Sequence, residues 1–188
     1  RAGLAIVCCE PTSALMFRVD HANLLDDPDV ELVARQTQEL AAYVWQLHQQ
    51  GRLPLRFLDP LPLNVGHHVP CHVKALAGGG ANSLAGPNLL RLIPQLQVET
   101  LDVSCSGMAG PFGMSEHHYA DSLRAGRPML ERLAREAIHC ASSECSACRL
   151  QMEDVTAKPS LHPVQYLAMA LGLLPELRQR LRHRRGMP

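Results

Sequence analysis

Four cysteines are the residues of this sequence whose type and spacing could do chemistry together. Cys71 stands alone, Cys105 lies in a turn of small residues, and Cys145 and Cys148 form a Cys-x-x-Cys pair. Thiolates are soft, anionic ligands that suit iron–sulfur clusters and zinc. The four residues therefore predict one metal site with four cysteine ligands.

Predicted strands directly precede the loops that carry these cysteines. Apolar stretches at residues 64–69, 98–103 and 137–142 are typical of buried strands, and a further strand is expected at residues 3–9. Helical patterns lie between them, which indicates βαβ units with right-handed crossovers. We therefore expect an α/β fold with an open, mainly parallel sheet of about four strands in a Rossmann-like three-layer arrangement. Because the carboxyl ends of parallel strands meet at one edge, the four cysteines should converge there.

Apolar spacing and capping signals predict the helices that link these strands. The clearest is an amphipathic helix over residues 30–47, which Gly51 ends. Two further helices, at residues 116–125 and 129–137, should be separated by Gly126 and Pro128. The remaining helices are expected at residues 12–25, 88–92, 146–154, 163–171 and 175–181. A loop is expected at residues 78–80 together with Asn82, Ser83, Gly86 and Pro87.

The surroundings of the four cysteines also suit a metal centre. Cys145 and Cys148 stand at a predicted helix start, where the helix dipole favours the ligating thiolate. Ser106 and Gly107 keep their loop small, so that backbone N–H groups can approach the sulfur atoms and tune a reduction potential. His72, next to Cys71, is expected beside the metal rather than as a ligand.

The other three cysteines have simpler interpretations. Cys140 lies inside an apolar strand and is expected to be a core thiol. Cys8 and Cys9 end the first predicted strand; burial and membership of a second site both remain open. Seven cysteines grouped in this way do not resemble a secreted disulfide framework, which favours reduced thiols in the cytoplasm.

Composition excludes several classes of function. The formal net charge is zero, which argues against nucleic-acid binding. No apolar run approaches the roughly 20 residues that a membrane span needs. A basic run near the C-terminus is typical of a solvated helix face or of contact with an anionic surface. We therefore expect a cytoplasmic chain whose membrane contact is at most peripheral, at the inner face.

Four motifs resemble the cysteine-rich CCG domain. They are Val-Pro-Cys-His at 69–72, Ser-Cys-Ser-Gly-Met-Ala-Gly-Pro-Phe-Gly at 104–113, Glu-Cys-Ser-Ala-Cys-Arg-Leu-Gln-Met at 144–152 and His-Pro at 162–163. This domain occurs in the cysteine-rich subunit of heterodisulfide reductases, in the iron–sulfur subunits of glycerol-3-phosphate dehydrogenase and glycolate oxidase, and in lactate-utilisation proteins. The resemblance is greatest to the C-terminal part of fused FAD-linked oxidase/Fe–S proteins that resemble D-lactate or D-2-hydroxyglutarate dehydrogenases.

The resemblance implies a bound 4Fe–4S cluster held by Cys71, Cys105, Cys145 and Cys148. The sequence departs from the family pattern at Ser106, which stands where the family has the second cysteine of the Cys-Cys-Gly triplet. Four thiolates remain, the usual complement of a 4Fe–4S cubane. The departure puts the five-cysteine site of the heterodisulfide reductases, and its disulfide chemistry, in doubt.

The resemblance also implies a division of the chain and a set of partners. Residues 1–58 resemble the tail of a first CCG-type repeat with linking helices, and residues 59–188 a second CCG-type domain with C-terminal helices. FAD would belong to the parent protein and not to this chain, which is not expected to turn over substrate alone. The implied partners are flavin and ferredoxin-like domains and a quinone or soluble electron acceptor.

Three functions are left open by the sequence. The first is an iron–sulfur electron-transfer module of an FAD-linked oxidoreductase that acts on a 2-hydroxy acid. The second is a structural zinc or metal-free interaction domain, because four thiolates also satisfy tetrahedral zinc. The third is a catalytic cluster of the heterodisulfide-reductase type.

Overall fold

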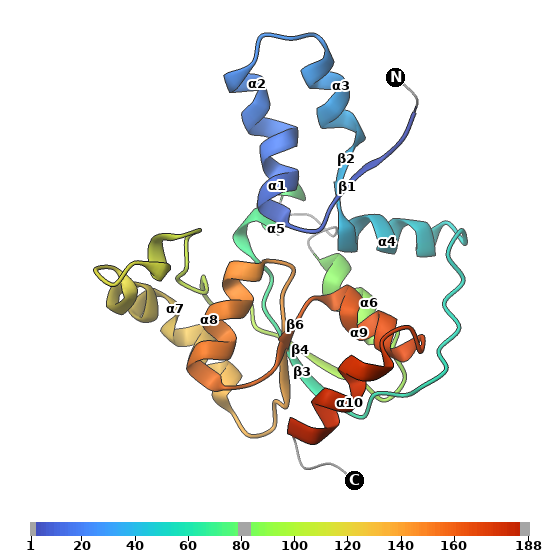
Figure 1. Cartoon of the computed structure of the whole chain (residues 1–188), viewed down its shortest axis with the longest axis vertical. Helices are drawn as coiled ribbons and strands as arrows, with labels where there is room; N and C mark the ends of the chain where they lie inside the picture. The colour runs from blue at the N-terminus through green and yellow to red at the C-terminus, as the bar shows by residue number, and fades with distance from the viewer. Residues whose placement is uncertain (1–2, 79–83, 185–188) are drawn as a thin grey trace.

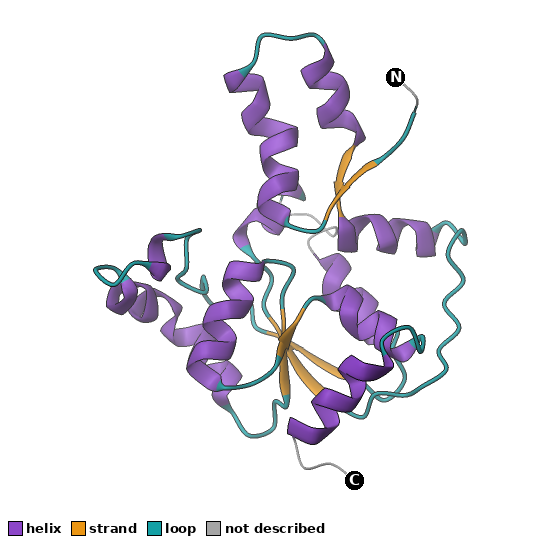
Figure 2. Cartoon of the chain, in the orientation of Figure 1, coloured by secondary structure: helices purple, strands orange, loops and turns teal. Residues whose placement is uncertain are grey.

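A four-stranded parallel sheet forms the centre of the computed structural model, which describes residues 3–78 and 84–184 (Figure 2). The strands run in the order β4 (Gln97–Thr100), β3 (Asn64–His67), β5 (Cys140–Ser142) and β6 (Ser160–Leu161). Every neighbouring pair is parallel, with Val65 opposite both Val98 and Cys140. The predicted α/β class with a parallel sheet and helical crossovers is confirmed.

Helices cover both faces of this sheet and bury it (Figure 1). On one face lie α7 (Tyr119–Ala134) and α8 (Ser146–Thr156); on the other lie α6 (Ala85–Arg91), α9 (Pro163–Ala170) and α10 (Pro175–Arg184). Alternation along the strands supplies both cores, because successive side chains point to opposite faces. Val65 and Cys140 pack with Leu89 and Tyr166, whereas Ala141 packs with Met129. The expected burial of Cys140 in the core agrees with this arrangement.

Residues 3–39 form a separate two-stranded sheet with its own helices. Strands β1 (Ile6–Cys8) and β2 (Thr37–Glu39) pair in parallel. Between them lie α1 (Pro11–Leu15), the π-helical turn η1 (Met16–Asp20), α2 (His21–Leu24) and α3 (Asp29–Gln36). Helices α2 and α3 extend away from the central sheet (Figure 1). The expected strand at residues 3–9 is therefore present, but it belongs to this second sheet.

The predicted single helix over residues 30–47 is wrong, because β2 divides it into α3 and α4 (Leu40–Gln49). Thr37 leaves the helix with an extended backbone. The Glu39 carboxylate then accepts hydrogen bonds from the backbone N–H groups of Ala41 and Ala42, both at 2.9 Å. This N-cap starts a new helix, and local capping outweighs the continuous apolar spacing on which the prediction rested.

The predicted break at Gly126 and Pro128 is also wrong, since α7 runs through both residues. Gly126 is required for a close approach instead: a Cβ there would lie 2.2 Å from the Ser106 carbonyl oxygen. Gly86 and Pro87, predicted in a loop, lie in the first turn of α6, where proline is tolerated. Most of that loop, residues 79–83, lies outside the described residues. No helix in the described ranges is long and apolar enough to cross a membrane.

Replacement of Gly126 tests this crossing of α7 over the Ser106 loop. Gly126→Ala should lower the free energy of unfolding by about 2 kcal/mol, because the new methyl group meets a backbone carbonyl that cannot rotate away. Urea unfolding of the purified chain measures this change. Arg127→Ala, an exposed neighbour on the same helix, is the control. Equal stability of Gly126→Ala and the wild type would contradict the close packing.

Candidate metal centre

Three neighbouring loops at the carboxyl edge of the sheet carry the four cysteines. Cys71 is the first residue of α5 (Cys71–Leu76), which follows β3. Cys105 lies in the loop after β4. Cys145 is the N-cap residue of α8, after β5, and Cys148 lies in the first turn of that helix. Because β3 is flanked by β4 and β5, these loops are adjacent.

The four thiols are close enough to influence one another's ionisation. The pKa of Cys71 is raised by burial and then by the neighbouring Cys105 and Cys145 thiols. The pKa of Cys148 is raised by its hydrogen bond to Cys145, by burial and by Cys105. Several thiolates cannot form together here without a compensating positive charge. A metal centre bound at this edge would supply that charge.

A hydrogen bond joins the two thiols of the Cys-x-x-Cys pair. The Cys148 thiol donates to Cys145 and lowers the pKa of Cys145 to about 6, although burial and the Glu10 carboxylate oppose this change. Backbone N–H groups of Ala147 and Cys148 at the start of α8 favour the Cys145 thiolate further. Cys145 is therefore the first of the pair to ionise.

Ser106 and Gly107 contact the sulfur atoms directly. The Ser106 hydroxyl donates to Cys148 Sγ at 3.1 Å, and the backbone N–H of Gly107 donates to Cys105 Sγ at 3.3 Å. Ser106 is buried. Both contacts are of the kind that stabilises thiolate charge and tunes a metal centre.

Helices α7 and α8 hold the Ser106 loop in place, which the sequence did not reveal. Gly107 has a φ of +95°, and a Cβ there would lie 2.0 Å from the Ser122 carbonyl oxygen. The Gln151 amide donates to the Ser106 carbonyl at 2.9 Å and accepts from the Ser122 hydroxyl at 3.0 Å. Gln151 and Ser122 are both buried.

His72 lies beside Cys71 and points to the first segment of the chain. Its Nδ1 atom lies 2.7 Å from the hydroxyl of Thr12. Its backbone N–H is hydrogen-bonded to the Cys71 thiol and favours the thiolate. Cys8, by contrast, is buried at the end of β1, and Cys9 is exposed. The role of these two cysteines stays open.

The site has a buried half and an exposed half. Cys145 and Cys148 are 8% and 6% exposed and belong to the apolar core beneath α7 and α8. Cys71 and Cys105 are exposed. A metal centre held by all four would be shielded on one side and reachable from the other.

The donor set fits an iron–sulfur cluster chemically: four soft thiols, two hydrogen-bond donors to sulfur and an apolar backing. The same four thiols also satisfy the ligand preference of zinc. Within residues 3–78 and 84–184, no three His, Cys, Asp or Glu side chains are grouped closely enough for one metal ion. The assignment of the four ligands stays a prediction.

A buried polar cluster lies behind the site, and the sequence reasoning missed its acidic member, Glu144. His67 Nε2 lies 3.6 Å from Glu144 Oε2, and both side chains are fully buried. Burial lowers the pKa of His67 to about 3, and burial followed by the Glu39 charge raises the pKa of Glu144 to about 8. Burial thus favours the neutral form of both groups. No periodicity or spacing signal marks a buried carboxyl group immediately before a candidate metal ligand.

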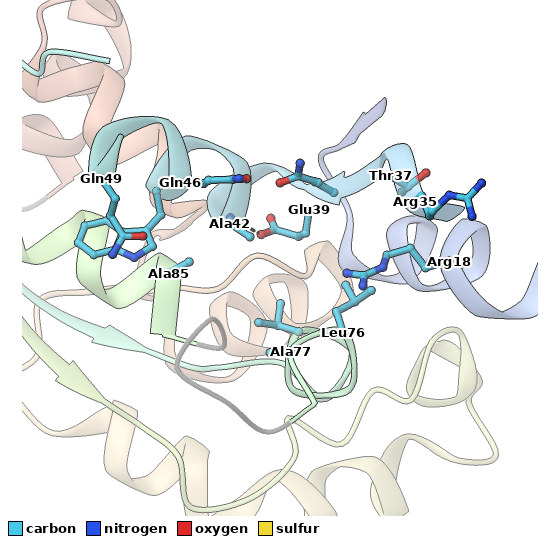
Figure 3. A pocket seen from close by; sticks show the side chains of 13 residues that line it. Arg18, Arg35, Thr37, Glu39, Ala42, Gln46, Gln49, Leu76, Ala77 and Ala85 are labelled. Carbon is cyan, nitrogen blue, oxygen red and sulfur yellow. Dashed lines mark hydrogen bonds between the residues drawn. The ribbon is translucent and has the colours of Figure 1, made fainter. Parts of the chain in front are cut away.

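A pocket of about 420 Å³ lies beside this centre, between α4 and α5 (Figure 3). Arg18 points toward it from the first segment, Arg35 lies at its edge, and Trp45 and Leu76 contribute apolar surface. Arg35 also pairs with Glu31. None of the four candidate metal ligands lines the pocket, so it is separate from the cysteine site.

Comparison with known proteins identifies dehydrogenase subunits as relatives. The chain is 30% identical over 172 residues to a subunit of the anaerobic glycerol-3-phosphate dehydrogenase of Escherichia coli K12, across 90% of this chain and 41% of that protein. The counterpart in E. coli O157:H7 matches equally. The chain thus spans about two fifths of the length of the curated relatives it matches. No protein-family model matches it.

The names of these relatives agree in part with the family resemblance seen in the sequence motifs. The chain is similar to a subunit of an oxidoreductase, and glycerol-3-phosphate dehydrogenase is one of the enzymes named by the sequence resemblance. The similarity extends beyond the cysteine motifs, because it covers nine tenths of this chain. The more specific likeness, to fused FAD-linked oxidases, stays a prediction.

The pH dependence of the unfolding free energy tests whether His68, beside the site, is buried in its neutral form. Burial lowers the pKa of His68 to about 4 from an ordinary value near 6.5. The stability that the neutral ring provides is therefore complete above pH 6.5 and is lost as the pH falls toward 4, by up to roughly 3 kcal/mol.

Urea unfolding between pH 7 and 5 measures this loss in the metal-free chain. In His68→Gln, unfolding should take up about one proton fewer. The slope of the unfolding free energy against pH should therefore fall by roughly 1.4 kcal/mol per pH unit. His117→Gln, at an exposed position, is the control for loss of a histidine. An unchanged pH dependence in His68→Gln would contradict the burial of a neutral His68.

Proposed function

We propose that this chain is an iron–sulfur electron-transfer module of a larger FAD-linked oxidoreductase. The observation that carries the proposal is that the loops bearing Cys71, Cys105, Cys145 and Cys148 follow three adjacent parallel strands, where burial and neighbouring thiols raise the pKa of Cys71 and Cys148. A bound 4Fe–4S cluster would accept and release single electrons. Similarity to one subunit of a dehydrogenase supports the same class of function.

The chain's own residues support relay rather than substrate chemistry. Cys145 and Cys148 would anchor the cluster in the apolar core, while Ser106 and Gly107 donate hydrogen bonds that stabilise charge on the sulfur atoms. The exposed Cys71 side leaves a face for a redox partner. In this proposal no side chain of the chain itself has a catalytic role, and the chain does not turn over substrate alone.

The wider context follows from the resemblance and the relatives. We propose that electrons pass from a 2-hydroxy acid to FAD in the parent protein, through ferredoxin-like domains and this module, to a quinone or soluble acceptor. Glycerol-3-phosphate, named in the relatives, is the rival substrate; both molecules carry a secondary alcohol. The separate sheet formed by β1 and β2 supports a first CCG-type repeat that ends within residues 1–58. A cytoplasmic location, at most peripheral at the inner membrane face, fits reduced thiols.

Metal content of the anaerobically purified chain tests the proposal. We expect brown protein with about four irons per chain, the complement of a 4Fe–4S cubane. Serine variants of Cys71, Cys105, Cys145 and Cys148 should each lose most of this iron. Cys140→Ala should keep it, because Cys140 lies in the core on the opposite face. Colourless protein with one zinc per chain would support the structural-zinc alternative and contradict the proposal.

Ser106 separates electron relay from the heterodisulfide-type alternative. In the relay proposal Ser106→Ala keeps the iron and lowers the reduction potential, because Cys148 loses a hydrogen bond that stabilises the added electron. An EPR-monitored redox titration measures the change, with Ser104→Ala in the same loop as control. Loss of the cluster in Ser106→Ala, together with thiol–disulfide reductase activity of the wild type, would favour a fifth-ligand catalytic site.

A further inference from the structure

A short strap from the first segment, residues Glu10 to Thr12, crosses the starts of both cysteine-bearing helices. Both Glu10 carboxylate oxygens accept from the backbone N–H of Ser146, each at 3.2 Å, at the start of α8. Two residues along, the Thr12 hydroxyl lies 2.7 Å from His72 in the first turn of α5. One strap thus reaches the residue after Cys71 and the residue after Cys145.

The Glu10 contact is long-range and charged. It joins residues 136 positions apart and satisfies a backbone N–H group in the first turn of α8, which otherwise has no partner within the helix. The N-cap residue of α8, Cys145, makes no capping hydrogen bond with its own side chain. A carboxylate at a helix N-terminus is stabilised by the helix dipole. Glu10 therefore acts as an N-cap supplied from a distant segment.

Arg149 fixes this carboxylate from the other side. Its Nη2 atom lies 3.8 Å from Glu10, while its Nη1 atom donates to the carbonyls of Ser143 and Glu144 at 2.7 and 2.8 Å. The guanidinium thereby connects the strap to the loop between β5 and Cys145. Arg149 is 19% exposed and Glu10 is 34% exposed, so the pair is only partly screened by water.

We infer that Glu10 is a positioning residue that holds the Cys145–Cys148 helix start and keeps the reduction potential of the bound cluster low. The inference rests on the cluster proposed above. A fixed negative charge beside the cluster ligands disfavours an added electron, because net charge near a cluster is one of the terms that set its potential. The first segment thereby tunes the metal centre of the second domain without contributing a ligand.

Three variants separate charge from packing. Glu10→Gln keeps an acceptor oxygen but removes the charge, Glu10→Asp keeps the charge on a shorter side chain, and Glu31→Gln removes an exposed carboxylate on α3. In anaerobic, iron-loaded protein, Glu10→Gln should raise the midpoint potential of the cluster, measured by EPR-monitored titration. Glu10→Asp should restore most of the wild-type value, and Glu31→Gln should leave it unchanged.

Amide hydrogen exchange provides a second readout in the same samples. Glu10→Gln should speed exchange of the Ser146 N–H by about tenfold, since a charge-assisted hydrogen bond is replaced by a weaker one. Iron-loaded Glu10→Gln with a wild-type potential and wild-type exchange would overturn this inference and leave the proposed function intact. A wild-type chain that binds no iron would overturn both.

Discussion

Parallel pairing of β3 with β4 on one side and β5 on the other is the constraint on which the candidate metal centre depends. Because all three strands run the same way, their following loops emerge at one edge, and loops that carry cysteines up to 77 residues apart lie next to one another there. An antiparallel partner at either position would send one cysteine loop to the opposite edge. The helices on both faces stabilise this arrangement by burying the central strands β3 and β5.

Interactions at the strand ends then refine the centre. Ser106 and Gly107 reach sulfur atoms only because Gly126 lets α7 approach the Ser106 carbonyl and Gln151 binds it from α8. Glu10 reaches the start of α8 from the first segment. The metal chemistry proposed for this chain therefore draws on contacts from both of its sheets.

Much of this arrangement follows from the sequence, and the failures have identifiable physical causes. The α/β class and the placement of the cysteine loops after parallel strands could be predicted because buried strands and crossover helices obey general rules, whereas the short strand β6 was not expected. The break at Thr37 could not, since it depends on a single carboxylate, Glu39, that caps the next helix. The burial of Glu144 and the reach of Glu10 depend on tertiary packing, which leaves no trace in local periodicity.

An anaerobic crystal structure of the iron-loaded chain, with anomalous difference maps at the iron and zinc absorption edges, tests the central claim most directly. The account predicts four iron peaks in one compact group, bonded to Cys71, Cys105, Cys145 and Cys148, with the Ser106 hydroxyl beside the Cys148 sulfur. A single zinc peak at these cysteines, or iron bound by a different set of residues, would contradict it.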